Sequence, residues 1–377
     1  MKRVLLLVVL AALSVPAVVQ AGGPVVRYVD ADGRAGPGGC GGSAGAFRTI
    51  QDAIDASGAG DTVLVCPGVY REIVSSAGIV GLTIRALEAH RAVIQQPPGQ
   101  RVRDRQALVS LVDARLEGFR IRPAPGAGCA PVAAMVLVYG TATVRGNRIV
   151  GSPPFQKDCG LYEDAVIHNS RGPSGTFELR VAANVIRDFR SAGVAFETEL
   201  IPVNATIRRN VFARAHGEPA TLKQHGYAVW TGFNSATVHV MRNLIRTAPG
   251  VRRMKKGIYS MWSVDSSIRA NIISGVNQGT AAYGSAVVVD NVLLGGTGTG
   301  MKTGSDLEIE RNLVRGFERG IVLSSTGATV RGNDFRGNRR WDCVDRSTGD
   351  GTAGTSNTWN GNLGHTSQPD GICWPVL

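Results

Sequence analysis

The sequence of 377 residues is poor in several residue types, and each shortage excludes a class of protein. Aromatic residues make up 6% of the chain and charged residues 19%. Basic residues are not interleaved with aromatic ones and no nucleic-acid-binding motif is present, so we expect no nucleic-acid partner. Beyond the N-terminus no apolar run is long enough to span a bilayer. C-x-x-C pairs are missing too, and no histidine lies beside a cysteine pair, which argues against a metal or redox site built on cysteine.

The first residues predict export. Basic residues precede an apolar run over residues 4–13, and small residues follow at the cleavage positions of a secretory signal peptide. We expect residues 1–21 to be removed by cleavage near Ala21. Residues 22–377 would then form a secreted or periplasmic protein without a transmembrane segment.

Six cysteines, an even number, suit an oxidising compartment. Six cysteines permit fifteen pairings, and the sequence alone does not choose between them. Consecutive cysteines are separated by about the length of one structural repeat or one large loop, which favours sequential pairing. Each bridge would then join an inserted loop to the repeat that carries it. The predicted disulfides are Cys40 with Cys66, Cys129 with Cys159, and Cys343 with Cys373.

One asparagine recurs in a fixed setting eight times, preceded and followed by β-branched or aliphatic residues, as in SIRANII and VVVDNVLL. The last three intervals are 20, 21 and 21 residues, and a period near 20 indicates a solenoid. The apolar residues alternate within each unit, so each unit supplies strands. The repeated residues are Asn147, Asn184, Asn210, Asn243, Asn271, Asn291, Asn312 and Asn333. We interpret them as structural, because a polar side chain at one inward position can hydrogen-bond along a stack of coils.

The beginning of the chain carries four motifs in succession. They are Tyr28-Val29-Asp30, Phe47-Arg48-Thr49-Ile50-Gln51-Asp52-Ala53-Ile54-Asp55, Gly60-Asp61-Thr62-Val63-Leu64-Val65 and Pro67-Gly68-Val69-Tyr70-Arg71-Glu72. With the repeat, they resemble the right-handed parallel β-helix of the pectin-lyase-like superfamily, from about Tyr28 to the C-terminus. They are similar to secreted β-helix proteins of the nitrous-oxide-reductase-maturation type. The resemblance implies an all-β solenoid of about 10 coils, and it says little about chemistry.

Both ends of the solenoid are expected to be covered. Thr49 and Asp52 form a capping-box pattern, and Ile50, Ala53 and Ile54 form an apolar helical face, so a short N-terminal capping helix is predicted. The segment at about 341–377 lacks strand periodicity and contains the last cysteine pair. We predict an irregular, disulfide-closed C-terminal cap. No Pro/Ser-rich linker divides the chain, so residues 22–377 are predicted to form a single domain.

The charge balance points to an anionic partner. Lysine and arginine total 41 against 29 aspartates and glutamates, a formal net charge of +12. For an exported protein the candidate polyanions are uronate polysaccharides and cell-surface glycans. The alternative is that the excess arginine only solvates the surface.

Period-two alternation predicts a functional row on one outer face of the middle coils. We expect His168, Glu197 and Trp230 in this row, with either Tyr259 or Trp262. Aromatic rings stack on pyranose faces, and charged groups handle protons or carboxylates. Adjoining insertions add further basic residues: Lys223, His225, Arg252, Arg253, Lys255 and Lys256. We predict catalytic roles for His168, Glu197, Lys223, His225 and Lys255 and substrate binding by Trp230, Tyr259, Trp262, Arg252, Arg253 and Lys256. The alternative is that these are ordinary solvated loop residues.

The reaction stays open at this point. Cationic groups beside a uronate carboxylate would prepare β-elimination, so a polysaccharide lyase is favoured over a glycoside hydrolase. The chain lacks the Asp-Asp, Gly-His-Gly and Arg-Ile-Lys signatures of polygalacturonase-like β-helices and the Arg-x-Pro-x-x-Arg of pectate lyases. The other hypothesis is a non-catalytic, monomeric cell-surface or periplasmic β-helix that binds or has a structural role. No metal ligand set and no certain cofactor is indicated, and Ca²⁺ use is left open.

Overall fold

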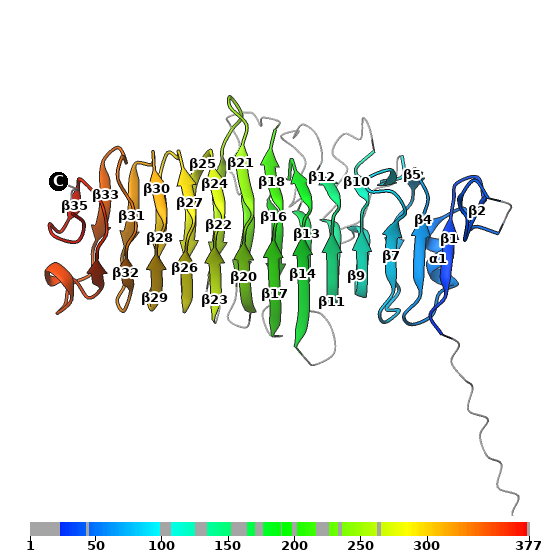
Figure 1. The fold of residues 1–377 in the computed structure, drawn as a ribbon, viewed down its shortest axis with the longest axis horizontal. Coiled ribbons are helices and arrows are strands. Elements are labelled where there is room, and N and C mark those ends of the chain that lie inside the picture. Colours follow the sequence, from blue (N-terminus) through cyan, green and yellow to red (C-terminus); the bar gives the residue numbers. More distant parts are fainter. Residues whose placement is uncertain are drawn as a thin grey trace, which may run out of the picture.

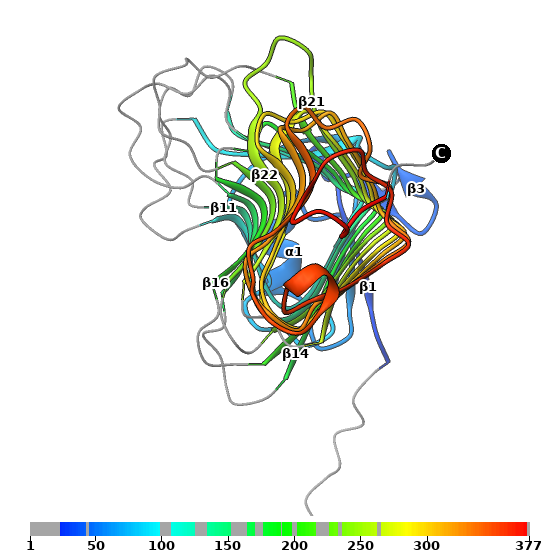
Figure 2. The ribbon, with the colours of Figure 1, turned by 90° about the vertical axis from the view of Figure 1, so that its left-hand side faces the viewer.

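The chain forms an elongated solenoid of parallel strands (Figure 1). The computed structural model describes residues 23–42, 45–98, 107–124, 134–151, 164–169, 176–189, 191–197, 202–215, 226–232, 236–261 and 265–374. Seen end-on, the strands of successive coils lie behind one another and enclose one continuous core (Figure 2). The all-β prediction is confirmed.

Three strand positions repeat in each coil and build three parallel sheets. The first sheet contains the strands that precede the corner of each coil, which holds an asparagine from β11 onward. They are β1 (Val26–Val29), β4 (Thr62–Val65), β7 (Thr83–Ala86), the ends of β9 (Ala107–Glu117) and β11 (Ala134–Arg145), β14 (Phe177–Ala182), β17 (Val203–Arg208), β20 (Ala236–Met241), β23 (Ser266–Arg269), β26 (Ala286–Val289), β29 (Leu307–Glu310), β32 (Thr329–Arg331) and β34 (Thr358–Asn360).

The second sheet contains ten short strands that follow this corner. They are β5 (Gly68–Arg71), β8 (Ala92–Gln95), β10 (Arg120–Arg122), β12 (Arg148–Val150), β15 (Val185–Arg187), β18 (Val211–Arg214), β21 (Leu244–Thr247), β24 (Ile272–Ser274), β27 (Val292–Leu294) and β30 (Leu313–Arg315). The labelled members lie along the upper edge of the molecule in Figure 1.

The third sheet closes each coil. Its members are β6 (Val74–Ser75), the beginnings of β9 and β11, β13 (Asp164–Asn169), β16 (Ala192–Glu197), β19 (Tyr227–Gly232), β22 (Met254–Ser260), β25 (Val276–Ala282), β28 (Thr299–Thr303), β31 (Arg319–Leu323), β33 (Trp341–Asp345) and β35 (Ser367–Gln368). Because β9 and β11 run through both positions, the first and third sheets are joined through hydrogen bonds.

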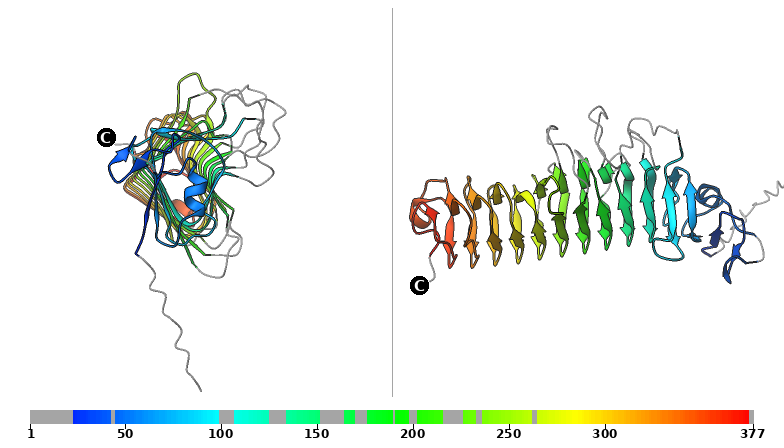
Figure 3. Two further views of the ribbon diagram at one scale, coloured as in Figure 1. Left: turned by 90° about the vertical axis from the view of Figure 1, so that its right-hand side faces the viewer. Right: turned by 90° about the horizontal axis from the view of Figure 1, so that it is seen from above.

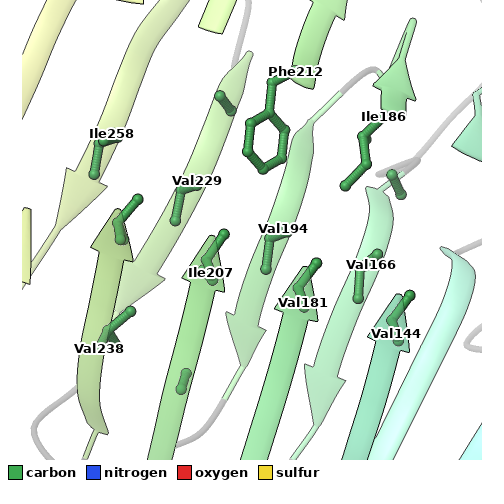
Figure 4. Packing of buried hydrophobic residues seen from close by; sticks show 14 of the residues in the cluster. Val144, Val166, Val181, Ile186, Val194, Ile207, Phe212, Val229, Val238 and Ile258 are labelled. Atoms are coloured by element: carbon green, nitrogen blue, oxygen red, sulfur yellow. The ribbon is translucent and has the colours of Figure 1, made fainter. Parts of the chain in front are cut away.

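Alternation along each strand builds the core. In Figure 4, β-branched side chains of successive coils lie in rows between the sheets, among them Val181, Ile207 and Val238. These three side chains are completely buried or nearly so. Each coil buries its apolar face only by stacking on the next coil, which explains why the sequence repeats.

The asparagines form a continuous hydrogen-bonded ladder at the corner between the first and second sheets. The backbone N–H and Nδ2 of Asn243 both donate to Oδ1 of Asn271, at 3.0 Å each. Nδ2 of Asn271 also donates to the carbonyl of Val240, at 2.8 Å, and so ties the coils together. All eight predicted asparagines are buried in this ladder. A ninth, Asn362, extends it and was not predicted.

A short helix lies at the N-terminal end, as seen end-on in Figure 3 (left). Helix α1 (Ile50–Asp55) begins at Thr49, whose side chain accepts a hydrogen bond from the N–H of Asp52. Its apolar face is buried against β1, β4 and β6. The carboxylate of Glu72 accepts hydrogen bonds from two further backbone N–H groups of the first turn. Nearby, β2 (Ala35–Gly36) and β3 (Gly39–Cys40) form an antiparallel pair.

Two of the three predicted disulfides are confirmed. Cys40 is bonded to Cys66, with Cα atoms 5.8 Å apart, and Cys343 to Cys373, with Cα atoms 6.3 Å apart. The third predicted pair, Cys129 and Cys159, lies outside the described residues, as does the predicted signal peptide. In the part of the chain that is described, no helix has the length and hydropathy needed to cross a membrane.

The C-terminal segment differs from the irregular cap that was predicted. Strands β33, β34 and β35 continue the third and first sheets, and Asn362 continues the ladder. A 3₁₀ turn, η1 (Thr352–Gly354), lies between β33 and β34. These strands have two to five residues each, which is too short to give a periodic pattern among the many polar and glycine residues of this segment.

Glycines of the third sheet make room for apolar side chains of the second. A Cβ atom at Gly300 would lie 2.7 Å from the carbonyl oxygen of Gly320 and would also collide with Val314. We expect Gly300→Val to lower the free energy of unfolding by about 3 kcal/mol, because the clash involves backbone that cannot move aside. At Gly38, a Cβ atom meets nothing within 4 Å, so Gly38→Val is the matched control. Equal urea midpoints for the two variants would contradict this packing.

Candidate functional site

Aromatic and basic side chains gather on the outside of the third sheet, over β19, β22, β25 and β28. Tyr227 is the register partner of Lys256, and Trp230 is the partner of Tyr259. The row that starts at Trp230 continues through Tyr259 and Ala281 to Lys302. Trp230 and Tyr259 therefore share one row, and Lys302 lies further along it.

Three tyrosines lie along the solenoid axis in successive coils. The rings of Tyr227 and Tyr259 are stacked, with centroids 5.6 Å apart and planes inclined by 27°. Tyr283 follows β25 and meets Tyr259 edge to face, with centroids 6.2 Å apart. We call Tyr227, Trp230, Lys255, Lys256, Tyr259, Tyr283 and Lys302 the tyrosine–lysine surface. Its aromatic part is a rigid platform, because each ring is held by a strand or by the residue directly after one.

Lys256 lies at the centre of this surface. Its Nζ is 3.6 Å from the ring centroid of Tyr259 and 6.0 Å from that of Tyr227. Nζ of Lys255 is also 6.0 Å from the Tyr227 ring. Burial of the Lys256 amine, assisted by the nearby positive charges of Lys255 and Lys302, lowers its pKa to about 8. The structure therefore singles out Lys256, for which the sequence predicted only a binding role, as the lysine whose charge is easily lost.

The tyrosines keep their protons at neutral pH. Burial raises the pKa of Tyr227, Tyr259 and Tyr283, and neighbouring tyrosines add to the effect for the first two. Neutral hydroxyl groups can donate and accept hydrogen bonds. The surface thus combines apolar ring faces, neutral hydroxyls and ammonium groups.

The predicted row needs correction at His168, and Glu197 lies beside the row. His168 lies at the register position of Val138 and Phe196, whose side chains are in the core. Glu197 lies one position further along its strand, opposite Gly232. His168 is therefore one residue out of phase with the row of Trp230, and a shift of one residue changes the face. Glu197 is two residues beyond Ala195, the partner of Trp230, so its position is on the same face as Trp230 but in the neighbouring row.

The structure describes only some of the other predicted site residues. Arg252 and Arg253 are half-buried just before β22, and Lys255 is exposed at its beginning. Lys223, His225 and Trp262 lie outside the described residues. Tyr227 and Tyr283 were not predicted, and only their aromatic character beside an apolar strand could have indicated them.

An outer apolar cluster adjoins the tyrosine–lysine surface. Alanine and leucine side chains of β9, β11 and β16 form a buried cluster outside the main core, and Tyr139, Tyr227 and Trp230 pack against it. The cluster consists of Ala107, Ala134, Leu137, Ala192 and Ala195. The aromatic platform is therefore anchored at its N-terminal end by apolar contacts.

A separate open groove of about 570 Å³ lies on the outside of the first sheet, over β20, β23 and β26. Nδ1 of His239 is 2.9 Å from Oγ of Ser267 in this groove. Asp265, Asp306 and Glu308 also line it. Its carboxylates give this groove a different chemistry from the tyrosine–lysine surface.

The sequence shows a relationship to a known family over part of the chain. Residues 204–367 match the family described as periplasmic copper-binding protein (NosD). No curated protein matches the sequence.

Solved structures agree with the fold. The Dettilon tailspike protein is 12% identical, with a TM-score of 0.51 over 84% of this chain and 64% of that protein. The A-module of a mannuronan C-5 epimerase from Azotobacter vinelandii is 14% identical, with a TM-score of 0.46 over 84% of this chain and 83% of the other. The catalytic unit of an alpha-1,3-glucanase from Streptomyces thermodiastaticus is 14% identical, with a TM-score of 0.45 over 95% and 72%.

The strand pattern and the similarity to the tailspike protein define the fold of this chain. The chain is a parallel β-helix repeat protein, and its residues 204–367 match a periplasmic family. The periplasmic description and the two disulfides indicate a location outside the cytoplasm.

The described residues do not fit the copper named in the family description. Among them, the one group of three or more close donor residues is Asp30, Cys40 and Cys66. The two cysteines are bonded to each other, so their sulfurs are not available as thiolate ligands. No step of the mechanism is therefore assigned to copper.

Proposed function

We propose that this protein is an exported β-helix that binds an anionic, uronate-type polysaccharide along the tyrosine–lysine surface. The observation that carries the proposal is the position of Lys256, whose Nζ lies 3.6 Å from the Tyr259 ring while that ring stacks on Tyr227. A ring platform binds the apolar faces of pyranose rings, and an ammonium group beside it pairs with a uronate carboxylate. The net charge of +12 favours the approach of a polyanion.

The platform repeats once per coil. Tyr227, Tyr259 and Tyr283 belong to successive coils, and parallel strands lie about 4.8 Å apart. A sugar chain has one ring in roughly the same length, so the three tyrosines suit neighbouring units of one chain. Arg252, Arg253, Trp230 and Lys302 lie at or near this platform as further contacts.

The proposal includes the form of the mature protein. Cleavage near Ala21 leaves residues 22–377 as a single, monomeric domain. Helix α1 covers the first coil and prevents end-to-end stacking of molecules.

Retention on immobilised polysaccharide tests the binding. We expect the mature protein to be retained on polygalacturonate and alginate and released by salt, because the contacts are partly ionic. A neutral glucan of similar length is the control and should retain it much less. Equal retention on the neutral polymer would contradict the proposal.

The lowered pKa of Lys256 predicts an unusual pH dependence. The amine has a pKa of about 8 in the free protein, and a bound carboxylate would raise it. Well below pH 8 the Lys256 amine carries its full positive charge and supports binding. As the pH rises through 8 this charge is lost and binding weakens, whereas an ordinary lysine would keep its charge. Retention measured across this range checks the prediction. The Lys256→Arg variant, which stays charged, should lose the decline, and an unchanged profile in this variant would count against the assignment.

A second candidate function, β-elimination, is favoured by the same lysine. A neutral Lys256 amine can take the C5 proton beside a uronate carboxylate, the C4–O4 bond then breaks, a C4–C5 double bond forms, and the leaving O4 takes up a proton. Lys255, His225, Lys223 and Glu197 remain the sequence-based proposals for the remaining proton transfers. Growth of ultraviolet absorbance on polygalacturonate, alginate or glycosaminoglycans, with and without Ca²⁺, and its loss in Lys256→Gln would support a lyase. Retention without any absorbance change on these polymers would favour the non-catalytic binding protein.

A further inference from the structure

The second sheet has an outer face of unusual composition. Its ten strands contain eight arginines and no aspartate, glutamate or lysine. Arg214 is buried, whereas the others are half-buried or exposed. The eight are Arg71, Arg120, Arg122, Arg148, Arg187, Arg214, Arg246 and Arg315. Such a one-sided charge is not needed for solubility, because the chain as a whole already has a large net charge.

Aliphatic side chains run along the same face in an unbroken row. Val185, Val211, Leu244, Ile272, Val292 and Leu313 are register partners in successive coils, and we call them the aliphatic stripe. Ile272 is 48% exposed, and the other members are half-buried. In the next outward row Leu294 is 41% exposed. Stacking on neighbouring coils therefore leaves much of the apolar surface in water.

The first sheet provides an internal comparison. Its outward row through the same coils is polar at almost every position: Arg180, Thr206, His239, Ser267, Val287, Glu308 and Thr329. The strands of both sheets belong to the same repeat. The aliphatic stripe is thus a property of one face and not of the repeat.

Arginines occupy the N-terminal part of the row that forms the stripe. Arg120 and Arg148 are register partners, and Arg148 is followed by Val185. Like charges on adjacent strands destabilise each other, and no carboxylate among the described residues forms an ion pair with either arginine.

The carboxylates close to the ends of these strands already have partners, and one of them, Asp334, is paired with an arginine of this sheet. Glu72 caps helix α1, and Asp188 accepts a hydrogen bond from the N–H of Ala215. Asp334 forms ion pairs with Arg315 and Arg336. An external anion would therefore be needed to balance the positive charge of this face.

We propose that the outer face of the second sheet docks on an anionic lipid surface. The aliphatic stripe enters the interfacial layer, and the guanidinium groups of Arg120, Arg148 and Arg187 bind lipid phosphates. A face that combines aliphatic and cationic side chains, with no carboxylate within its ten strands, matches the chemistry of such a surface. A second copy of this chain fits less well, because a two-fold contact would bring arginine rows together. The tyrosine–lysine surface lies on another sheet and remains free to bind a glycan.

Co-sedimentation of the mature protein with vesicles tests this docking. We expect binding to vesicles of phosphatidylcholine with phosphatidylglycerol and little binding to phosphatidylcholine alone. Each arginine near the surface contributes about fivefold in affinity, so Arg148→Gln/Arg187→Gln should lose more than tenfold. The matched control, Arg180→Gln/Arg208→Gln, changes the same net charge on the exposed face of the first sheet and should lose much less.

A second pair of variants tests the aliphatic stripe without removing charge from the arginines. Ile272→Asp places a carboxylate at a half-exposed position and should reduce vesicle binding about tenfold. Thr206→Asp is its control on the first sheet. Unchanged melting temperatures would show that these variants fold. Equal losses of vesicle binding for the two arginine pairs, or no preference for phosphatidylglycerol vesicles, would overturn the proposal. Binding of an acidic protein without binding of lipid would mean that this face docks on a protein partner instead. Lys256→Gln should leave vesicle binding unchanged, which separates this docking from glycan binding.

Discussion

Replacing Asn271 by leucine is expected to lower the free energy of unfolding by about 4 kcal/mol, the largest stability effect that we predict for one side chain. The change leaves the backbone N–H and Nδ2 of Asn243 without their acceptor. It also removes the donor to the carbonyl of Val240 and to Oδ1 of Asn291. All these groups lie in the solenoid interior, where water cannot replace the lost partners, and buried groups without partners are costly.

The same substitution at an exposed asparagine is the matched control. Asn204 is exposed on the first sheet, and its Nδ2 donates to the carboxylate of Glu178 at 3.3 Å. Asn204→Leu should change the unfolding free energy by less than about 1 kcal/mol. Urea unfolding followed by circular dichroism measures both. If the two variants had similar urea midpoints, the asparagine ladder would not be the main source of stability at this corner.

The second large effect concerns binding. We expect Lys256→Gln/Tyr259→Ser to lose roughly thirtyfold in affinity for polygalacturonate. One lost ring platform and one lost ion pair correspond to about 2 kcal/mol together, and each factor of ten corresponds to about 1.4 kcal/mol. Both side chains lie partly in water, so the fold should tolerate the change.

The control for this variant removes a charge elsewhere. Arg269 is exposed on the first sheet, and Arg269→Gln changes the net charge without altering the tyrosine–lysine surface. It should reduce affinity by a small factor that disappears at moderate salt. Titration with defined oligogalacturonates gives the affinities. A loss of the same size in the control would mean that binding follows net charge and has no site.

Parts of this structure could be predicted from the sequence because the repeat imposes them. The asparagine recurs in nearly identical surroundings, so its burial in a ladder follows from hydrogen-bond satisfaction alone. Asn362 was not predicted because the residues before it, Trp359 to Gly361, lack the aliphatic neighbours found in the other coils. The strands of the second sheet have only three or four residues, and an alternating pattern cannot be recognised over so few positions.

The site was harder to predict than the fold. A face assignment depends on where each strand begins, and the insertions before β13 and β16 hid this, which explains the error at His168. Tyr227 and Lys256 are partners across a coil, and the sequence contains no local sign of that contact. The lowered pKa of Lys256 likewise depends on burial and on charges from neighbouring coils. Such properties arise only when coils of different length are placed in register.

The most direct test of the proposed function is the pKa of Lys256 itself, measured by NMR of the lysine side chains with and without trigalacturonate. We predict a pKa of about 8 in the free protein, an increase when the oligosaccharide binds, and simultaneous shifts of the Tyr259 ring signals. If saturating trigalacturonate left the Lys256 and Tyr259 signals unchanged, the tyrosine–lysine surface would not be the glycan-binding site.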